Sequence, residues 1–184
     1  ENVYLTAAIF GLYLTFSTKN KKWLFLTLAS LFVFYVLISK FIPWARGEQH
    51  FAAEYFAEFG DTPPEILSNL ILNPLKTISS FLTQPNLAYI YKLLLPVGFL
   101  SIFSPLILFF AGPDIAINLL SENENLRDIT FHYGATIIPF IYIAAIYILK
   151  RIFNLRLKFI TPKLASCFII AFSILSTWQY GVLP

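Results

Sequence analysis

Stretches of apolar residues long enough to cross a lipid bilayer constrain this chain more than any other feature of its sequence. The clearest is Trp23–Ile42, which covers about 20 residues and opens on a tryptophan of the kind found at membrane interfaces. A helix needs roughly 20 mostly apolar residues to cross a hydrocarbon core about 30 Å thick. Charged residues make up only 12% of the chain, about half of the ~25% typical of soluble domains. The sequence therefore predicts an all-α, polytopic transmembrane bundle.

Pro43–Asn86 is the one long polar stretch between these apolar runs. The turn Thr18–Lys22, before the Trp23–Ile42 crossing, contains three lysines, and the positive-inside rule places it in the cytoplasm. Pro43–Asn86 follows that crossing and is therefore predicted to be an extracytoplasmic loop. Within it, Thr62 and the two prolines that follow are typical of a helix start, and the helix runs to Asn73. A second short helix is predicted over Leu75–Leu82. Both helices are amphipathic and either lie on the outer membrane surface or form a small folded cap on the transmembrane helices.

The remaining apolar runs complete a single transmembrane domain, residues 1–184, of about six membrane passes. The expected passes are Val3–Ser17, Trp23–Ile42, Leu87–Phe103, Leu106–Leu120, His132–Leu149 and Leu164–Val182.

The third and fourth passes are inferred from the distribution of basic residues, which decides between an odd and an even number of crossings; we call this the charge-parity argument. A single crossing over Leu93–Gly112 would put the basic loop Lys150–Lys163 outside, against the positive-inside rule. A hairpin of two crossings, turning at Ser104–Pro105, puts that loop in the cytoplasm. The alternative is a re-entrant pair of half-helices, which the prolines and glycines between Pro96 and Pro113 permit.

The chain has no methionine and begins with Glu1 directly before an apolar run, with no basic leader segment. We therefore expect it to be part of a longer membrane protein, with the lipid bilayer and the preceding half of that protein as its partners. Cys167 is the only cysteine, so no disulfide can form within the chain. The net charge of +3 gives no reason to expect a nucleic-acid partner.

No motif of a soluble enzyme is present: there is no phosphate loop, dinucleotide-binding turn, paired-histidine zinc motif or nucleophile elbow. Polar residues gather instead on the predicted outer side. Glu54 and Glu58 are four residues apart and would share a helix face, with Asp61 close by. Such carboxylates can act as acid and base or hold a divalent cation, which is the one cofactor that the sequence suggests. The alternative is a solvated helix face.

A second polar group, Arg127, Asp128, His132 and Tyr133, lies at the outer mouth of the predicted fifth pass. A histidine at the start of a membrane helix could bind phosphate or move a proton. Neighbouring His and Tyr side chains also occur simply as interfacial anchors.

Asp114 and Lys92 are charged residues inside predicted passes. Asp114 shares a helix face with Asn118 near the outer end of the fourth pass. An acidic group at membrane depth is a functional candidate, although it is merely interfacial if the helix ends early. Lys92 is expected to extend its ammonium group to the interface.

Several motifs together resemble an uncharacterised family of predicted polytopic bacterial and archaeal membrane proteins. They are G-D-x-P-x-E-I at Gly60–Ile66, N-P-L at Asn73–Leu75, L-L-P-x-G-F-L-x-I-F-S-P-L at Leu94–Leu106, I-N-L-L-S at Ile117–Ser121, and H-Y-x-A-x-x-x-P-F at His132–Phe140. In layout that family is similar to membrane glycosyltransferases of the GT-C type, which use polyprenyl-phosphate sugar donors.

This resemblance implies a transferase that works at the outer membrane face. The essential acidic residue of such enzymes would lie upstream of Glu1, in a longer protein of which this chain is the C-terminal part. Glu54 and Asp61 would be the catalytic carboxylates in this chain. The remaining candidates would bind the donor or its phosphate: His132, Arg127, Tyr133 and Asp114.

Two other functions stay open. Broken helices and an acidic residue at depth suit a transporter or flippase, but the centres of the predicted passes are almost wholly apolar, which counts against transport. The chain could also be a non-catalytic membrane subunit.

Overall fold

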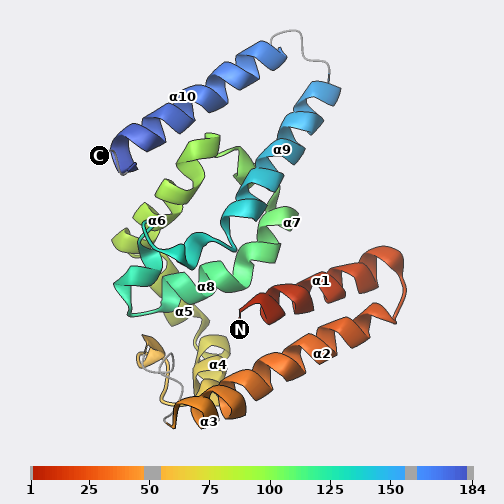
Figure 1. The fold of residues 1–184 in the computed structure, drawn as a ribbon, viewed down its shortest axis with the longest axis vertical. Helices are drawn as coiled ribbons and strands as arrows, with labels where there is room; N and C mark the ends of the chain where they lie inside the picture. The colour runs from red at the N-terminus through yellow and green to blue at the C-terminus, as the bar shows by residue number, and fades with distance from the viewer. Residues whose placement is uncertain (1, 48–54, 156–160, 182–184) are drawn as a thin grey trace. The chain divides into compact units, whose positions relative to one another are not determined.

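The computed structural model describes residues 2–47, 55–155 and 161–181, and all the regular elements within these ranges are helices (Figure 1). The chain divides into two compact units. The first unit comprises Glu1–Phe81 and Gly112–Glu124, and the second comprises Leu82–Ala111 and Asn125–Pro184.

The first unit opens with an antiparallel helical hairpin, visible in red and orange in Figure 1. Helix α1 (Val3–Thr18) is joined by a tight turn to α2 (Trp23–Val36). Gly11 allows the two helices to approach closely, because a Cβ atom there would lie 2.8 Å from the backbone nitrogen of Thr27. The Thr27 hydroxyl in turn donates a hydrogen bond to the carbonyl oxygen of Ala8, at 3.1 Å. A small residue and a satisfied hydroxyl are what close packing between membrane helices requires.

Helix α2 continues through a π-helical segment, Leu37–Phe41, into α3 (Ile42–Arg46). Within the described residues, Trp23–Ala45 is the one helix of 18 or more residues that is apolar enough to cross a membrane. This helix agrees with the predicted Trp23–Ile42 pass. Val3–Thr18 and Pro105–Leu120 are apolar but shorter. The count of six passes is therefore not established by the helices and stays a prediction.

Both short helices predicted in the polar loop are present. Helix α4 covers Pro63–Leu72, and α5 covers Pro74–Phe81. Thr62 takes the expected extended conformation before α4, but its side chain makes no capping hydrogen bond. The proline at the start of α4 suits the first turn, where its missing N–H is not needed. The first unit is completed by α8 (Gly112–Leu120), which packs against α1 and α5.

The second unit consists of three longer helices and a chain of short turns. The longer helices are α6 (Gln84–Leu94), α9 (Ile138–Asn154) and α10 (Pro162–Tyr180). Helix α7 (Pro105–Leu108) packs against α9. One side of α9 is buried, and α6, α7 and the turns between them pack against this helix, while α10 packs against the turn at Leu95–Val97. Its buried residues are Ile141, Ala144, Ala145 and Ile148.

The predicted third pass, Leu87–Phe103, is wrong as one continuous helix. Helix α6 ends at Leu94 and gives way to two 3₁₀ turns, Leu95–Val97 and Leu100–Phe103. Between them Gly98 and Phe99 both take positive φ angles, 59° and 61°. Two successive left-handed residues redirect the chain, so a helix cannot continue through them. The chain thus has the broken path that the re-entrant alternative requires.

The predicted fifth pass, His132–Leu149, begins six residues before the helix that the structure shows. His132–Gly134 forms a separate 3₁₀ turn, and α9 begins at Ile138 with a proline in its first turn. Proline is tolerated there because its missing N–H would have no partner within the helix. The sixth predicted pass, Leu164–Val182, corresponds to α10, where the Thr161 hydroxyl accepts a hydrogen bond from the N–H of Leu164 at 3.2 Å.

Candidate functional site

Hydrogen bonds in the first unit join the loop before α4 to the loop after α8. The N–H of Glu122 donates to the carbonyl oxygen of Tyr55 at 2.7 Å, and the N–H of Glu58 donates to Glu122 Oε1 at 3.0 Å. Lys76 of α5 reaches the same place: its Nζ donates to the carbonyl oxygen of Glu58 at 2.7 Å and lies 3.5 Å from Glu58 Oε1. We call these four residues the Glu58 cluster.

The Glu58 cluster bears on membrane topology. Residues 55–58 and 121–124 are in direct hydrogen-bonded contact, so they lie on the same side of any membrane that the chain crosses. The segment between them must then cross an even number of times or not at all. A single crossing over Leu93–Gly112 would put these residues on opposite sides, so the contact favours the even number of crossings that the charge-parity argument predicts.

Of the two predicted catalytic carboxylates, the structure describes only Asp61. Glu54 lies outside the described residues. Asp61 is exposed, and its N–H donates to Glu65 Oε2 at 3.2 Å, which ties the loop to the first turn of α4. Among the residues that the structure describes, no three His, Cys, Asp or Glu side chains gather closely enough to hold a metal ion.

Asp114 lies in the first turn of α8, and its side chain is buried within the protein. Only 3% of its surface is exposed, and the same holds for Asn118, one turn further along the same helix face. Thr6 Oγ1 on α1 donates to Asp114 Oδ2 at 3.4 Å. The shared face was correctly predicted, and the contact with α1 was not. In this conformation the carboxylate serves the packing of α8 against α1.

The second predicted polar group lies in the second unit, in the segment that precedes α9. We call residues 127–133 the Arg127 loop. The Asp128 carboxylate accepts hydrogen bonds from the Thr130 N–H at 2.9 Å and the Thr130 hydroxyl at 2.8 Å. These bonds stabilise the charged carboxylate and lower the pKa of Asp128, and the positive charge of Lys92 lowers it further. His132 and Tyr133 are exposed with their rings 4.4 Å apart, while Arg127 is half-buried.

Lys92 belongs with this loop, and sequence reasoning missed the association. Its ammonium nitrogen lies 5.4 Å from the centroid of the Tyr180 ring on α10, within range of a cation–π contact. Its charge also acts on Asp128. The sequence feature that could have indicated Lys92 is its position inside an apolar helix, because a charged residue in such a helix is a functional candidate in a membrane protein. In the second unit Lys92 therefore lies beside the Tyr180 ring, and its charge acts on Asp128 of the Arg127 loop.

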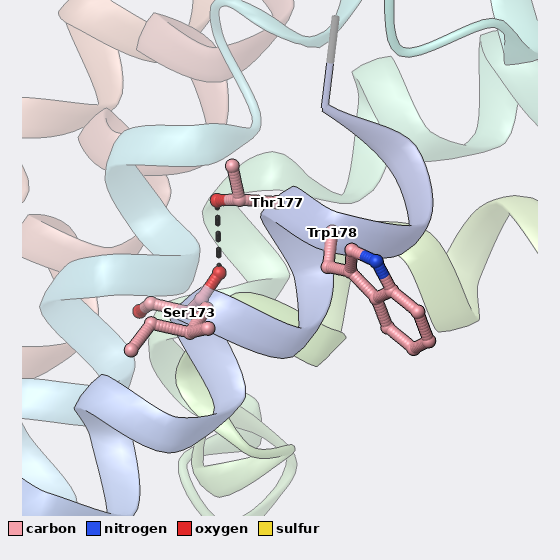
Figure 2. Close-up of a pocket in the computed structure, with 4 residues that line it drawn as sticks. Ser173, Thr177 and Trp178 are labelled. Atoms are coloured by element: carbon pink, nitrogen blue, oxygen red, sulfur yellow. Dashed lines mark hydrogen bonds between the residues drawn. The ribbon is translucent and has the colours of Figure 1, made fainter. Parts of the chain in front are cut away.

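A shallow depression on α10 is lined by Ser173, Ile174, Thr177 and Trp178. The hydroxyl of Thr177 donates to the carbonyl oxygen of Ser173 at 2.9 Å (Figure 2). The Ser173 hydroxyl donates to the carbonyl oxygen of Pro96 at 3.0 Å. Both hydroxyls thus satisfy backbone carbonyls, and the depression has no ionisable side chain in its lining. Its chemistry suits packing rather than catalysis.

Apolar helices that end in polar loops with aromatic side chains are typical of helical membrane proteins, and one described helix is long and apolar enough to cross a bilayer. A family model described as "Predicted membrane protein (DUF2079)" matches residues 1–180, and the chain belongs to this family. This confirms the resemblance to a family of predicted membrane proteins. No curated protein and no solved structure matches the chain.

Proposed function

We propose that this chain is part of a membrane glycosyltransferase of the GT-C type, which uses a polyprenyl-phosphate-linked sugar at the outer membrane face. The observation that carries the proposal is Lys92, which lies beside the Tyr180 ring and acts electrostatically on Asp128 of the Arg127 loop, in a unit built mainly of apolar helices. A polyprenyl phosphate has the complementary form, with an anionic head on a long apolar tail. Arginine, lysine and histidine at one end of apolar helices suit the head, and lipid-facing side chains suit the tail.

In the proposed reaction an acceptor hydroxyl attacks the anomeric carbon of the donor sugar. The bond from that carbon to the phosphate oxygen breaks, and polyprenyl phosphate leaves with the bonding electrons. The proton of the acceptor goes to a carboxylate, for which Glu54 and Asp61 are the candidates in this chain and an acidic residue upstream of Glu1 is a third. A divalent metal ion held by these carboxylates would stabilise the same leaving group.

The proposed donor-binding residues are those whose charge or hydrogen-bonding group complements a phosphate. Arg127 and His132 would stabilise the negative charge that develops on the departing phosphate, and Tyr133 would donate a hydrogen bond to it. Asp114 carries the wrong charge for a phosphate and is buried against Thr6. In this proposal it is a positioning residue, which holds α8 against α1.

The test is transfer from a radiolabelled polyprenyl-phosphate sugar by the purified full-length protein in liposomes. His132→Ala and Arg127→Ala should each lower kcat at least about tenfold, which corresponds to the loss of ~1.4 kcal/mol of transition-state stabilisation. Lys150→Ala, which removes an exposed basic residue near the other end of α9, should leave the rate unchanged. Equal rates in the His132→Ala, Arg127→Ala and unsubstituted proteins would refute the phosphate role.

A transporter or flippase is the second candidate, because the chain between α6 and α7 is broken at Gly98 and Phe99. Interrupted helices are the usual sites of substrate and ion binding in secondary transporters. The same liposomes distinguish the two. Movement of the labelled lipid between leaflets without transfer of its sugar would favour the flippase.

A further inference from the structure

Helices α4 and α5 expose their aliphatic side chains. Five leucine and isoleucine residues on the two helices are between 55% and 83% exposed. They are Leu67, Ile71, Leu72, Leu75 and Ile78. We call them the α4–α5 face. On a surface helix of a water-soluble protein, an aliphatic face of this kind normally packs against the core.

Asn69 and Thr77 of the same helices point the other way, toward the protein. Asn69 Nδ2 donates to the carbonyl oxygen of Phe59 at 2.8 Å, and the half-buried Thr77 hydroxyl donates to the carbonyl oxygen of Leu70 at 2.9 Å. Helix α5 is thus strongly amphipathic: Thr77, Ser80 and Phe81 are half-buried, whereas Leu75 and Ile78 are exposed. Aliphatic side chains turned outward are the opposite of what a surface helix of a soluble protein shows.

The α4–α5 face also carries no charge of its own. Helix α4 has one charged residue, Glu65, whose carboxylate accepts the N–H of Asp61 in the loop. Helix α5 has one, Lys76, which pairs with Glu58 and lies 5.1 Å from the centroid of the Phe59 ring. Both charges are therefore directed at the loop that precedes α4. The face has nothing with which to attract an oppositely charged protein partner.

We propose that the α4–α5 face inserts into the interfacial region of the lipid bilayer, with lipid acyl chains as its occupant. The first unit also contains Trp23–Ala45, the described helix that is long and apolar enough to cross a membrane, and its side chains are mostly apolar and exposed or half-buried, so a bilayer is the apolar surrounding available to this unit. Short helices with one apolar side lie in the membrane interface and bury that side among the upper acyl chains. Because Lys76, the basic residue of α4 and α5, is paired with Glu58, insertion depends on apolar burial and not on anionic lipids.

The test is the accessibility of spin labels on the purified protein in nanodiscs. Cys167→Ser removes the natural thiol, and Leu75→Cys or Ile78→Cys introduces one label site on the face. Ala57→Cys, exposed in the loop before α4, is the matched control. Labels at positions 75 and 78 should be relaxed more strongly by oxygen than by a water-soluble nickel chelate, and the label at position 57 should show the opposite order. Replacing neutral lipids with anionic ones should not change these ratios.

Each other outcome overturns the proposal. Nickel-dominated relaxation at positions 75 and 78 would place the face in water, and low accessibility to both reagents would mean that a protein surface covers it. An oxygen signal that appears only with anionic lipids would contradict the apolar mechanism. Label mobility at Leu72→Cys, on the neighbouring helix, checks that the two helices remain folded. Activity is not the readout, so failure here is distinguishable from failure of the proposed transferase.

Discussion

Thr130 fixes the charged state of its neighbour in the Arg127 loop. Its N–H and its hydroxyl both donate to the Asp128 carboxylate, and they lower the pKa of Asp128 below its ordinary value. A lowered carboxyl pKa means that the folded protein favours the ionised form. The resulting stabilisation is present above the pKa of the unfolded chain and is lost as the pH falls through the lowered pKa of the folded protein.

Thr130→Val should therefore raise the pKa of Asp128 part of the way toward its ordinary value, because the hydroxyl donor is lost while the backbone N–H remains. Thr130→Ser keeps both donors and should leave the pKa where it is. The measurement is the carbon chemical shift of the Asp128 carboxyl group in labelled protein as a function of pH. The same titration midpoint in all three proteins would show that the hydroxyl bond does not act on the carboxylate.

At the scale of single residues, the sequence indicated which side chains were unusual but not what they contact. Arg127, Asp128, His132 and Tyr133 stand together in one segment, so their grouping could be predicted. The partnership of Asp114 with Thr6 joins residues 108 positions apart, and no local pattern carries such a contact. The same limit applies to Lys92 and Tyr180.

At the scale of elements, the helices with a strong local signal were predictable. Apolar runs defined α1, α2 and α10, and threonine followed by two prolines defined the start of α4. The break after α6 was different, because Phe99 has no intrinsic tendency toward a positive φ. Its conformation is stabilised by the rest of the second unit: the Ser173 hydroxyl satisfies the carbonyl of Pro96, and the fully buried Ser101 donates to the carbonyl of Ile141 at 2.7 Å.

The break also depends on the absence of a side chain at Gly98. An added Cβ atom would lie 2.3 Å from Cε1 of Phe168 on α10, and the φ of 59° is unfavourable for any L-residue with a side chain. Gly98→Ala should lower the free energy of unfolding by at least the ~1–2 kcal/mol that a left-handed conformation costs. Phe168→Leu should recover part of this loss, because a smaller side chain relieves the collision. The measurement is the unfolding transition of each single variant and of the double variant in detergent.

The control for this experiment is Gly112→Ala, since the added Cβ at the start of α8 meets no atom within 4 Å apart from its chain neighbours and the backbone of its own helix. Alanine in a helix is favoured over glycine by about 0.5–1 kcal/mol, so this variant should be as stable as the original or slightly more so. Strict additivity of Gly98→Ala and Phe168→Leu would mean that the two side chains do not collide, contrary to the packing of α10 against the break.

At the scale of the whole molecule, the open question is how many times the chain crosses the membrane. Trp23–Ala45 is long enough for one crossing, and the lysines before it place its N-terminal end in the cytoplasm. Ala57 lies beyond the other end of this helix and should be outside. The Glu58 cluster then places Glu124 outside as well, because Glu122 is hydrogen-bonded to Tyr55 and Glu58.

Single cysteines at these positions, in a Cys167→Ser background, test this topology with a thiol reagent that cannot cross membranes. Ala57→Cys and Glu124→Cys should be labelled in intact cells, and Asn20→Cys should be labelled only after the membrane is opened. Each position is exposed, so a lack of labelling reports sidedness rather than burial. Labelling of position 57 but not 124 in intact cells would mean an odd number of crossings between them. That result would contradict the Glu58 cluster and the charge-parity argument together, since both require the chain to return to the side from which it left.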